Sequence, residues 1–177
     1  MYTELRTQRL LLRPLNVCDL ETTHAYAGDK ESTKYMIALP NETLEETKEF
    51  LEQAGVEWRK EKPQSYEFAI DLDGLHIGGI SITLDETRRE GELGWILHKD
   101  YWKKGYATEA AHAVKDFAIN TLRVSRLIAH CDSRNTASRR VMERLGMTLL
   151  SDDGIRYNRS SPEAAKELLY GLDIGEA

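Results

Sequence analysis

The sequence has few features of a membrane-bound or disulfide-stabilised protein. Its longest apolar run is Met36–Leu39 and its mean hydropathy is −0.53, so no segment predicts a membrane-spanning helix. The two cysteines, Cys18 and Cys131, cannot form a disulfide framework and suit a reducing compartment. The first residues include no apolar stretch of the signal-peptide type, so we expect a cytoplasmic protein.

Residues that mark linkers are also sparse. Four prolines and twelve glycines are scattered through 177 residues without a repeat, so we expect a single domain over residues 1–177. Basic residues are in deficit, with 24 Lys and Arg against 30 Asp and Glu, net −6. That balance argues against a nucleic-acid-binding protein. Hydrophobic residues make up 41% of the chain, which is enough for a core under a charged surface.

Hydrophobic periodicity predicts helices and strands in the first hundred residues. Apolar alternation predicts strands at 9–13, 68–72, 80–84 and 92–98, and the Asp73-Gly74 turn joins the second of them to the third. The last three strands form an antiparallel meander. A short helix runs from Asp19 to Gly28, and Asn41 is expected to cap a longer one ending near Lys60. The longer helix carries an approximate apolar stripe of Leu44, Phe50, Leu51, Ala54 and Trp58.

The second half of the chain predicts one parallel crossover. A helical stripe from Ala107 to Ala118 is followed by a buried strand at 126–131. Asn135 then caps a helix that Gly146 ends. Strand, helix, strand and helix in this order place one parallel pair inside a mainly antiparallel sheet. The C-terminal stretch is ambiguous, because 161–165 resembles a helix start whereas 168–174 would suit a hairpin with residues near Met147.

A turn at residues 101–110, Tyr-Trp-Lys-Lys-Gly-Tyr-Ala-Thr-Glu-Ala, carries the clearest chemical signal. The backbone N–H groups at a helix N-terminus lack intrahelical partners and lie at the positive end of the helix dipole, so such a turn binds phosphate oxygens. Gly105 and Ala107 let a diphosphate approach the main chain, and Lys103 and Lys104 add positive charge. The alternative is a tight turn whose small residues serve packing alone.

This turn resembles the acetyl-CoA-binding turn of the GNAT superfamily of N-acetyltransferases, whose pattern is Arg/Gln-x-x-Gly-x-Gly/Ala. Gly105 and Ala107 match the last two fixed places, and Trp102 departs from the first. The branch of ribosomal-protein N-terminal acetyltransferases often has Tyr-Trp-Gly-Lys-Gly-Tyr-Ala-Thr-Glu-Ala, which this chain matches except at Lys103. Residues 9–14, 92–97, 135–138 and 143–147 resemble further family motifs in the same order.

The resemblance implies a mixed α/β fold with helices on both faces of one mostly antiparallel sheet. The sheet would be splayed between its fourth and fifth strands, here near 92–98 and 126–131. The pantetheine arm of acetyl-CoA would lie in that opening. Its implied contacts are the strand backbone at Ile96, Leu97 and His98, the diphosphate turn at Lys103, Lys104, Gly105, Tyr106, Ala107 and Thr108, the side chain of Asn135, and Arg139 or Arg140 on the ribose phosphate.

The implied reaction is direct attack of an amine on the thioester, without a covalent enzyme intermediate. Glu92, which borders the opening, is the candidate base, and Ser138 is the candidate donor to the leaving sulfur. The alternatives are an exposed strand carboxylate and an ordinary first-turn serine. His98 is a second candidate base.

Other potentially reactive residues lack a supporting pattern. The histidines lie on different elements without metal-ligand spacing, so we expect no metal. Cys131 has no legible histidine partner and suits a core position better than a nucleophile.

The branch resemblance suggests that the acceptor is a protein N-terminal amine, such as that of a ribosomal protein. An α-amine has a pKa of about 7.7–8.0 against about 10.4 for lysine, so it loses its proton more readily by roughly 3.5 kcal/mol and needs only a modest base. The alternatives are a polyamine, an aminoglycoside or another small amine, and a non-catalytic CoA-binding sensor. The family often forms dimers, so either a monomer or a homodimer is expected, with neither a membrane nor nucleic acid as a partner.

Overall fold

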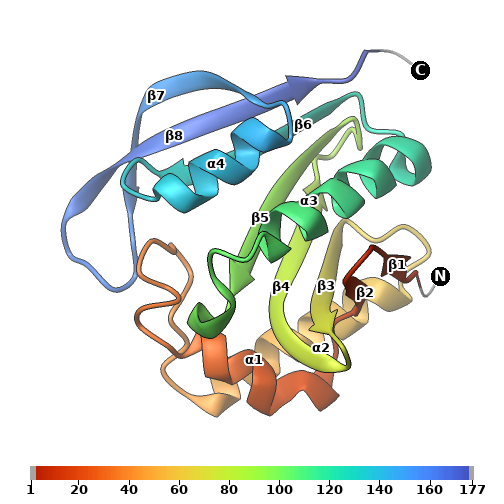
Figure 1. Cartoon of the computed structure of the whole chain (residues 1–177), viewed down its shortest axis with the longest axis vertical. Helices are drawn as coiled ribbons and strands as arrows, with labels where there is room; N and C mark the ends of the chain where they lie inside the picture. Colours follow the sequence, from red (N-terminus) through yellow and green to blue (C-terminus); the bar gives the residue numbers. More distant parts are fainter. Residues whose placement is uncertain (1–2, 176–177) are drawn as a thin grey trace.

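A computed structural model describes residues 3–175 of the chain (Figure 1). One eight-stranded sheet has the order β1-β2-β3-β4-β5-β6-β8-β7; β5 and β6 run parallel and the other neighbours antiparallel. The strands are β1 (Leu5–Arg6), β2 (Leu10–Pro14), β3 (Ser65–Leu72), β4 (Leu75–Leu84), β5 (Glu90–Leu97), β6 (Arg126–Asp132), β7 (Thr148–Tyr157) and β8 (Ala164–Asp173). The helices are α1 (Leu20–Ala27), α2 (Leu44–Arg59), α3 (Tyr106–Phe117) and α4 (Thr136–Arg144), with 3-10 turns η1 (Val17–Asp19) and η2 (Lys99–Tyr101) and a π-helical segment η3 (Ala118–Leu122). This confirms the expected mixed, mostly antiparallel sheet.

Helices cover both faces of the sheet. On β3, Ala69 packs with Leu15 and with Leu51 of α2. Its neighbours Phe68 and Ile70 point to the other face, where they join the larger core that includes the buried stripe of α3. In Figure 1, α3 and α4 lie on the near side, and α2 passes behind β3 and β4.

The predicted meander of β3, β4 and β5 is confirmed. Asp73 and Gly74 form the turn between β3 and β4, with φ of 50° and 83°. These left-handed angles suit the twist of a two-residue hairpin, and Gly adopts them without steric cost. In the meander, β5 is hydrogen-bonded to β4 along one edge, and its other edge borders the predicted opening.

The opening itself lies between β5 and β6. The two strands pair over Glu90–Arg126, Gly91–Leu127 and Glu92–Ile128, and their register ends there. β6 continues along β8 as far as Asp132, whereas β5 stays with β4 as far as Leu97. The splay is therefore confirmed, although it separates the fifth and sixth strands because the two-residue β1 was not anticipated from the sequence.

Two predictions about α2 were wrong, its N-cap and part of its buried stripe. Thr43, not Asn41, caps α2: its hydroxyl accepts from the Glu46 N–H at 3.2 Å, while the Asn41 side chain donates to Thr47 at 2.9 Å. The buried stripe of α2 consists of Thr47, Leu51, Ala54 and Trp58, and it leaves Leu44 and Phe50 exposed.

The structure decides between the two readings that the sequence left open for the C-terminal stretch. Residues 164–173 form β8, which pairs with β7 from Thr148–Gly171 to Tyr157–Ala164. The hairpin alternative, with residues just after Met147, is the one that the structure adopts. Ala165, Leu168 and Tyr170 are buried because β8 lies between β6 and β7.

No helix within residues 3–175 is long and apolar enough to cross a membrane.

Candidate active site

A tight turn connects the end of β5 to the start of α3. The chain passes through η2 and Trp102, takes left-handed conformations at Lys103 (φ 62°) and Gly105 (φ 82°), and enters α3 at Tyr106. A side chain at Gly105 would be strained by the positive φ, and its Cβ would lie 3.4 Å from the Arg9 guanidinium. The glycine therefore meets a requirement of the turn.

The turn leaves a row of backbone N–H groups without acceptors. Gly105 has no capping side chain, and its carbonyl accepts from the Glu109 N–H at 3.0 Å, so the first helical bond forms at once. Within residues 3–175, no acceptor is paired with the N–H groups of residues 103–108. These groups lie at the positive end of α3 and can donate to an anion.

Trp102 holds the turn against the end of β5. Its indole N–H donates to the Leu97 carbonyl at 3.0 Å, and its side chain is otherwise partly exposed. Lys104 donates to the Asp100 carbonyl at 3.0 Å, and its ammonium lies 5.4 Å from the Tyr101 ring centre. The residue that departs from the family pattern thus has a structural role in this chain.

A clamp that the sequence did not reveal braces the same turn. The Glu109 carboxylate accepts from the Thr7 hydroxyl at 2.6 Å, and from the Arg9 backbone and guanidinium at 2.8 and 2.7 Å. Arg9 also donates to the Lys104 carbonyl at 3.1 Å and stacks over Tyr106 at 4.5 Å. Partial burial alone would raise the pKa of Glu109, but the Thr7 and Arg9 hydrogen bonds bring it below its usual value.

The edge of β5 offers backbone groups to the opening. The His98 N–H donates to the Ile77 carbonyl of β4 at 2.9 Å. Because bonded residues alternate in an antiparallel pair, Ile96 also faces β4, whereas the backbones of Trp95 and Leu97 face the opening. Of the three expected pantetheine contacts on this strand, Leu97 is therefore the one that presents its backbone to the gap.

Glu92 lies on the last paired rung of β5 and contacts a histidine on β6. Its Oε1 is 2.9 Å from His130 Nδ1. The two side chains are 51% and 30% exposed, so solvent and ligands can reach both. The sequence placed His130 and Glu92 on separate strands and gave no sign that they meet. His98, the second candidate base, has its ring at the start of η2, where Nδ1 accepts from the Asp100 N–H at 3.3 Å.

The helix after β6 presents the remaining predicted residues. The Asn135 Oδ1 accepts from the Ser138 N–H at 3.1 Å, which confirms the cap and leaves the amide nitrogen available to a ligand. Arg140 is exposed, and Arg139 lies 3.8 Å from Glu143. Burial raises the pKa of the Cys131 thiol to about 11, so it stays protonated at neutral pH.

The long connection between α1 and α2 is tethered on both sides of the opening. Lys99, at the start of the turn, lies 3.1 Å from Asp29 and 3.3 Å from Glu31. From the other side, Arg156 donates to the Tyr35 carbonyl at 2.9 Å, and the Arg159 N–H donates to the Met36 carbonyl at 3.0 Å. These contacts hold the connection between α1 and α2 beside the opening. They come from Lys99 and from the β7–β8 hairpin, which are far apart in the sequence.

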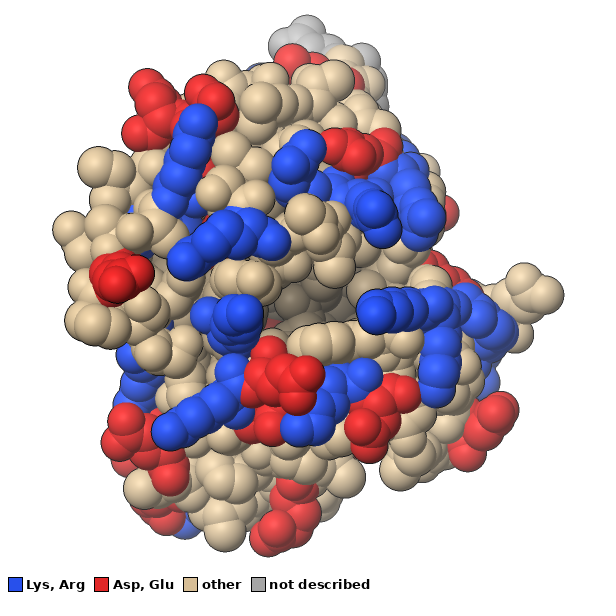
Figure 2. Space-filling model, turned by 60° about the vertical axis from the view of Figure 1, so that its left-hand side comes forward, with Lys and Arg blue, Asp and Glu red and all other residues tan. Residues whose placement is uncertain are grey.

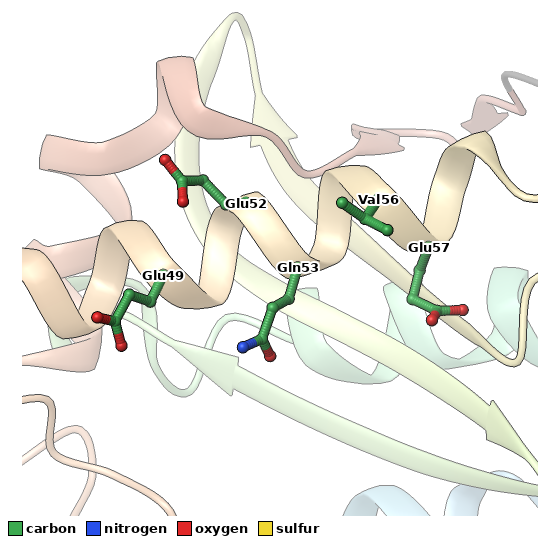
Figure 3. A pocket seen from close by; sticks show the side chains of 5 residues that line it. All are labelled: Glu49, Glu52, Gln53, Val56 and Glu57. Carbon is green, nitrogen blue, oxygen red and sulfur yellow. The ribbon is translucent and has the colours of Figure 1, made fainter.

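Surface charge distinguishes two faces. Figure 2 shows a hollow on one face of the molecule, with Lys and Arg side chains around much of its rim. A second hollow follows the outer side of α2, where Glu49, Glu52 and Glu57 lie beside Gln53 and Val56 (Figure 3). The second hollow lies opposite the buried stripe of α2 and shares no residue with the turn or the splay.

Comparison with known proteins identifies the family. Residues 9–148 match the acetyltransferase (GNAT) domain. The chain belongs to the GNAT family of N-acetyltransferases. It is 29% identical over 143 residues to the uncharacterized N-acetyltransferase YnaD of Bacillus subtilis, covering 80% of each protein. It is 24% identical over 139 residues to the spermidine N(1)-acetyltransferase of Escherichia coli K12, covering 78% of this chain and 72% of that enzyme.

Solved structures of GNAT proteins share the fold. A GNAT acetyltransferase from Bacillus anthracis superimposes with a TM-score of 0.84 at 28% identity, covering 97% of this chain and 99% of that one. RimL, a ribosomal-protein alpha-N-acetyltransferase solved with coenzyme A, gives 0.81 at 16% identity, covering 97% and 98%. The chain is therefore an acetyltransferase with the GNAT fold.

Proposed function

We propose that the chain transfers the acetyl group of acetyl-CoA to the amino group at the N-terminus of a protein, with a ribosomal protein as the first candidate. The observation that carries the proposal is the turn from Trp102 to Tyr106, whose unpaired N–H groups lie beside the splay of β5 and β6. Both the anion site and an open strand edge are needed to hold a long molecule that has a diphosphate at its middle.

The residues of the turn and the splay fit acetyl-CoA. The N–H groups of residues 103–108 suit the diphosphate, and the absence of a side chain at Gly105 allows close approach. Lys103, Lys104 and Arg140 are exposed cations that suit phosphate groups. The backbone of Leu97 and the amide of Asn135 suit the amide groups of pantetheine. Acetyl-CoA itself supplies an acetyl thioester, which a neutral amine can attack.

Two observations favour a protein N-terminus as the acceptor. The string from Tyr101 to Ala110 is similar to that of the ribosomal-protein acetyltransferases. An α-amine also loses its proton near neutral pH, so the partly exposed groups at the splay suffice as a base. Ser138, in the first turn of α4, would donate a hydrogen bond to the sulfur as it leaves.

A small polyamine is the second candidate acceptor. The match to a spermidine acetyltransferase favours it, as does the excess of acidic residues between Asp29 and Glu61, which would attract a cation.

The test combines coenzyme binding with turnover. Calorimetry with acetyl-CoA measures binding, and release of free thiol is followed with N-terminal peptides of ribosomal proteins, polyamines and aminoglycosides. Thiol release with the peptides and not with the small amines supports the proposal. Preference for polyamines would favour the second candidate. Coenzyme binding without thiol release for any amine would indicate a sensor, and no binding at millimolar acetyl-CoA would refute the assignment of the turn.

A further inference from the structure

We propose that His130 is the catalytic base of this enzyme, with Glu92 as the positioning residue that holds its ring. The inference rests on the proposed acetyl transfer and reassigns the base that the sequence suggested at Glu92. It begins from one contact, the 2.9 Å hydrogen bond between His130 Nδ1 and Glu92 Oε1 at the point where β5 and β6 separate.

The register places this pair at the apex of the opening. Glu92 is opposite Ile128 on the last rung, so their side chains share a face of the sheet. His130 lies two residues further along β6 and has the same orientation. If the pairing continued, Gly94 would be opposite His130. Gly94 has no side chain, so the space beside the imidazole on the β5 side is left open to a ligand.

The hydrogen bond selects the tautomer that a base requires. An ionised carboxylate only accepts, so Glu92 holds the proton of the imidazole on Nδ1 and leaves the lone pair on Nε2. Within the described residues, Nε2 has no hydrogen-bond partner. Imidazole is ordinarily a stronger base than a carboxylate, with a pKa of about 6.5 against about 4.3, which suits it better to remove a proton from an α-amine.

The other charged groups near His130 are already paired. Asp132, next on the same face of β6, is buried and accepts hydrogen bonds from Arg134 and Asn158, which outweigh the effect of burial and lower its pKa to about 2. On β8, Leu169 is opposite His130. Glu167, two residues before Leu169 and on the same face, is opposite Asp132, and its carboxylate lies 3.4 Å from the Arg156 guanidinium. Glu92 is therefore the carboxylate that the fold directs to the ring.

The chemical step balances without a further reactant. The acceptor ammonium gives one proton to His130 Nε2, and its nitrogen lone pair then forms the C–N bond at the thioester carbonyl. The C–S bond breaks, and the sulfur keeps the electron pair and takes up a proton. A second amine proton is lost as the amide forms, and the imidazolium releases its proton to water, so the net products are the amide, the thiol and one proton.

The first test examines the ring in the protein without ligands. Nitrogen-15 NMR of the histidine side chains should show His130 protonated on Nδ1 and unprotonated on Nε2 near pH 8. Glu92→Gln should redistribute the proton between the two nitrogens, because the carboxylamide no longer demands a donor. His112, exposed on α3, provides a reference signal that Glu92→Gln should leave unchanged. A proton on His130 Nε2, or a spectrum that Glu92→Gln does not alter, overturns the inference.

The second test measures kcat/KM against pH with the amine that the panel identifies. His130→Gln should lower kcat/KM by about 100-fold or more and leave an acid limb that reflects only the ionisation of the amine substrate. Glu92→Gln should lower kcat/KM by about tenfold and keep the wild-type shape of the acid limb. His112→Gln is the matched control and should retain the wild-type profile. Melting temperatures should stay within a few degrees, because an exposed cross-strand pair contributes little to stability.

The two proposals fail in distinguishable ways. Thiol release that His130→Gln leaves unchanged refutes the role of His130 and preserves the proposed function. Failure to bind acetyl-CoA refutes the proposed function, and with it the role of His130, whatever the tautomer.

Discussion

Replacement of Glu67 by glutamine should remove a pH-dependent loss of stability. Glu67 lies on β3, on the same face of the sheet as Ala69, and its partner on β4 is Ser81. The Ser65 hydroxyl donates to its carboxylate at a long 3.4 Å. Burial raises the pKa of Glu67 to about 7, and the Ser65 hydrogen bond only partly opposes that rise.

The sign and size follow from proton linkage. The ordinary pKa of this carboxyl is 4.5, so between pH 4.5 and about 7 the folded chain holds a proton that the unfolded chain releases. The free energy of unfolding therefore falls as pH rises through this window. Each pKa unit corresponds to about 1.4 kcal/mol, so the full loss from this group is at most about 3.5 kcal/mol, and contact of the half-buried carboxyl with solvent makes it smaller. Glutamine resembles the protonated acid and cannot ionise, so the variant should not show this loss.

Urea denaturation of wild type and Glu67→Gln at pH 4.5 and 8.5 measures the effect. The variant should match wild type at pH 4.5 and exceed it by about 2 to 3 kcal/mol at pH 8.5. Glu52→Gln, on the exposed side of α2, is the control and should differ from wild type by the same small amount at both values. An equal difference between Glu67→Gln and wild type at both pH values would show that the pKa of this half-buried carboxyl is not raised in the folded chain.

Substitutions at three further positions probe the turn, the leaving group and the ion pairs between β2, η1 and β3. Gly105→Trp should abolish acetyl-CoA binding in calorimetry, whereas Gly105→Ala should retain binding at a cost of about 1–2 kcal/mol in stability from the positive φ; equal affinity of Gly105→Trp and wild type would contradict the diphosphate assignment. Ser138→Ala should lower kcat by about 10- to 100-fold with unchanged coenzyme affinity, and an unchanged kcat would exclude it as the donor to sulfur. Arg13 donates to Asp19 and Asp71, both at 2.7 Å, so Arg13→Met should cost about 3–5 kcal/mol in urea denaturation by leaving two buried carboxylates unpaired. A loss below about 1 kcal/mol would contradict that account.

Local features of this protein follow from its sequence. The meander was predictable because alternation and the Asp73-Gly74 turn act over a few residues, as was the buried stripe of α3. The turn at Gly105 was predictable for the same reason, since steric limits at one backbone position require glycine. The start of α2 was predicted less accurately because two residues compete there. Both Asn41 and Thr43 suit a helix cap, and only the positions of the buried residues along α2 decide between them.

Tertiary structure decided which distant residues meet. Glu109 reaches Thr7 and Arg9 because β2 passes beside the start of α3, and no spacing in the sequence shows this contact. Glu92 and His130 meet because β5 and β6 are neighbours in one register, which strand periodicity alone does not set. Periodicity determines which face of a strand is buried, but strand order and register depend on packing across the whole sheet. The composition of the proposed anion-binding turn is therefore determined by the sequence, whereas the surroundings of the proposed catalytic groups are determined by the fold.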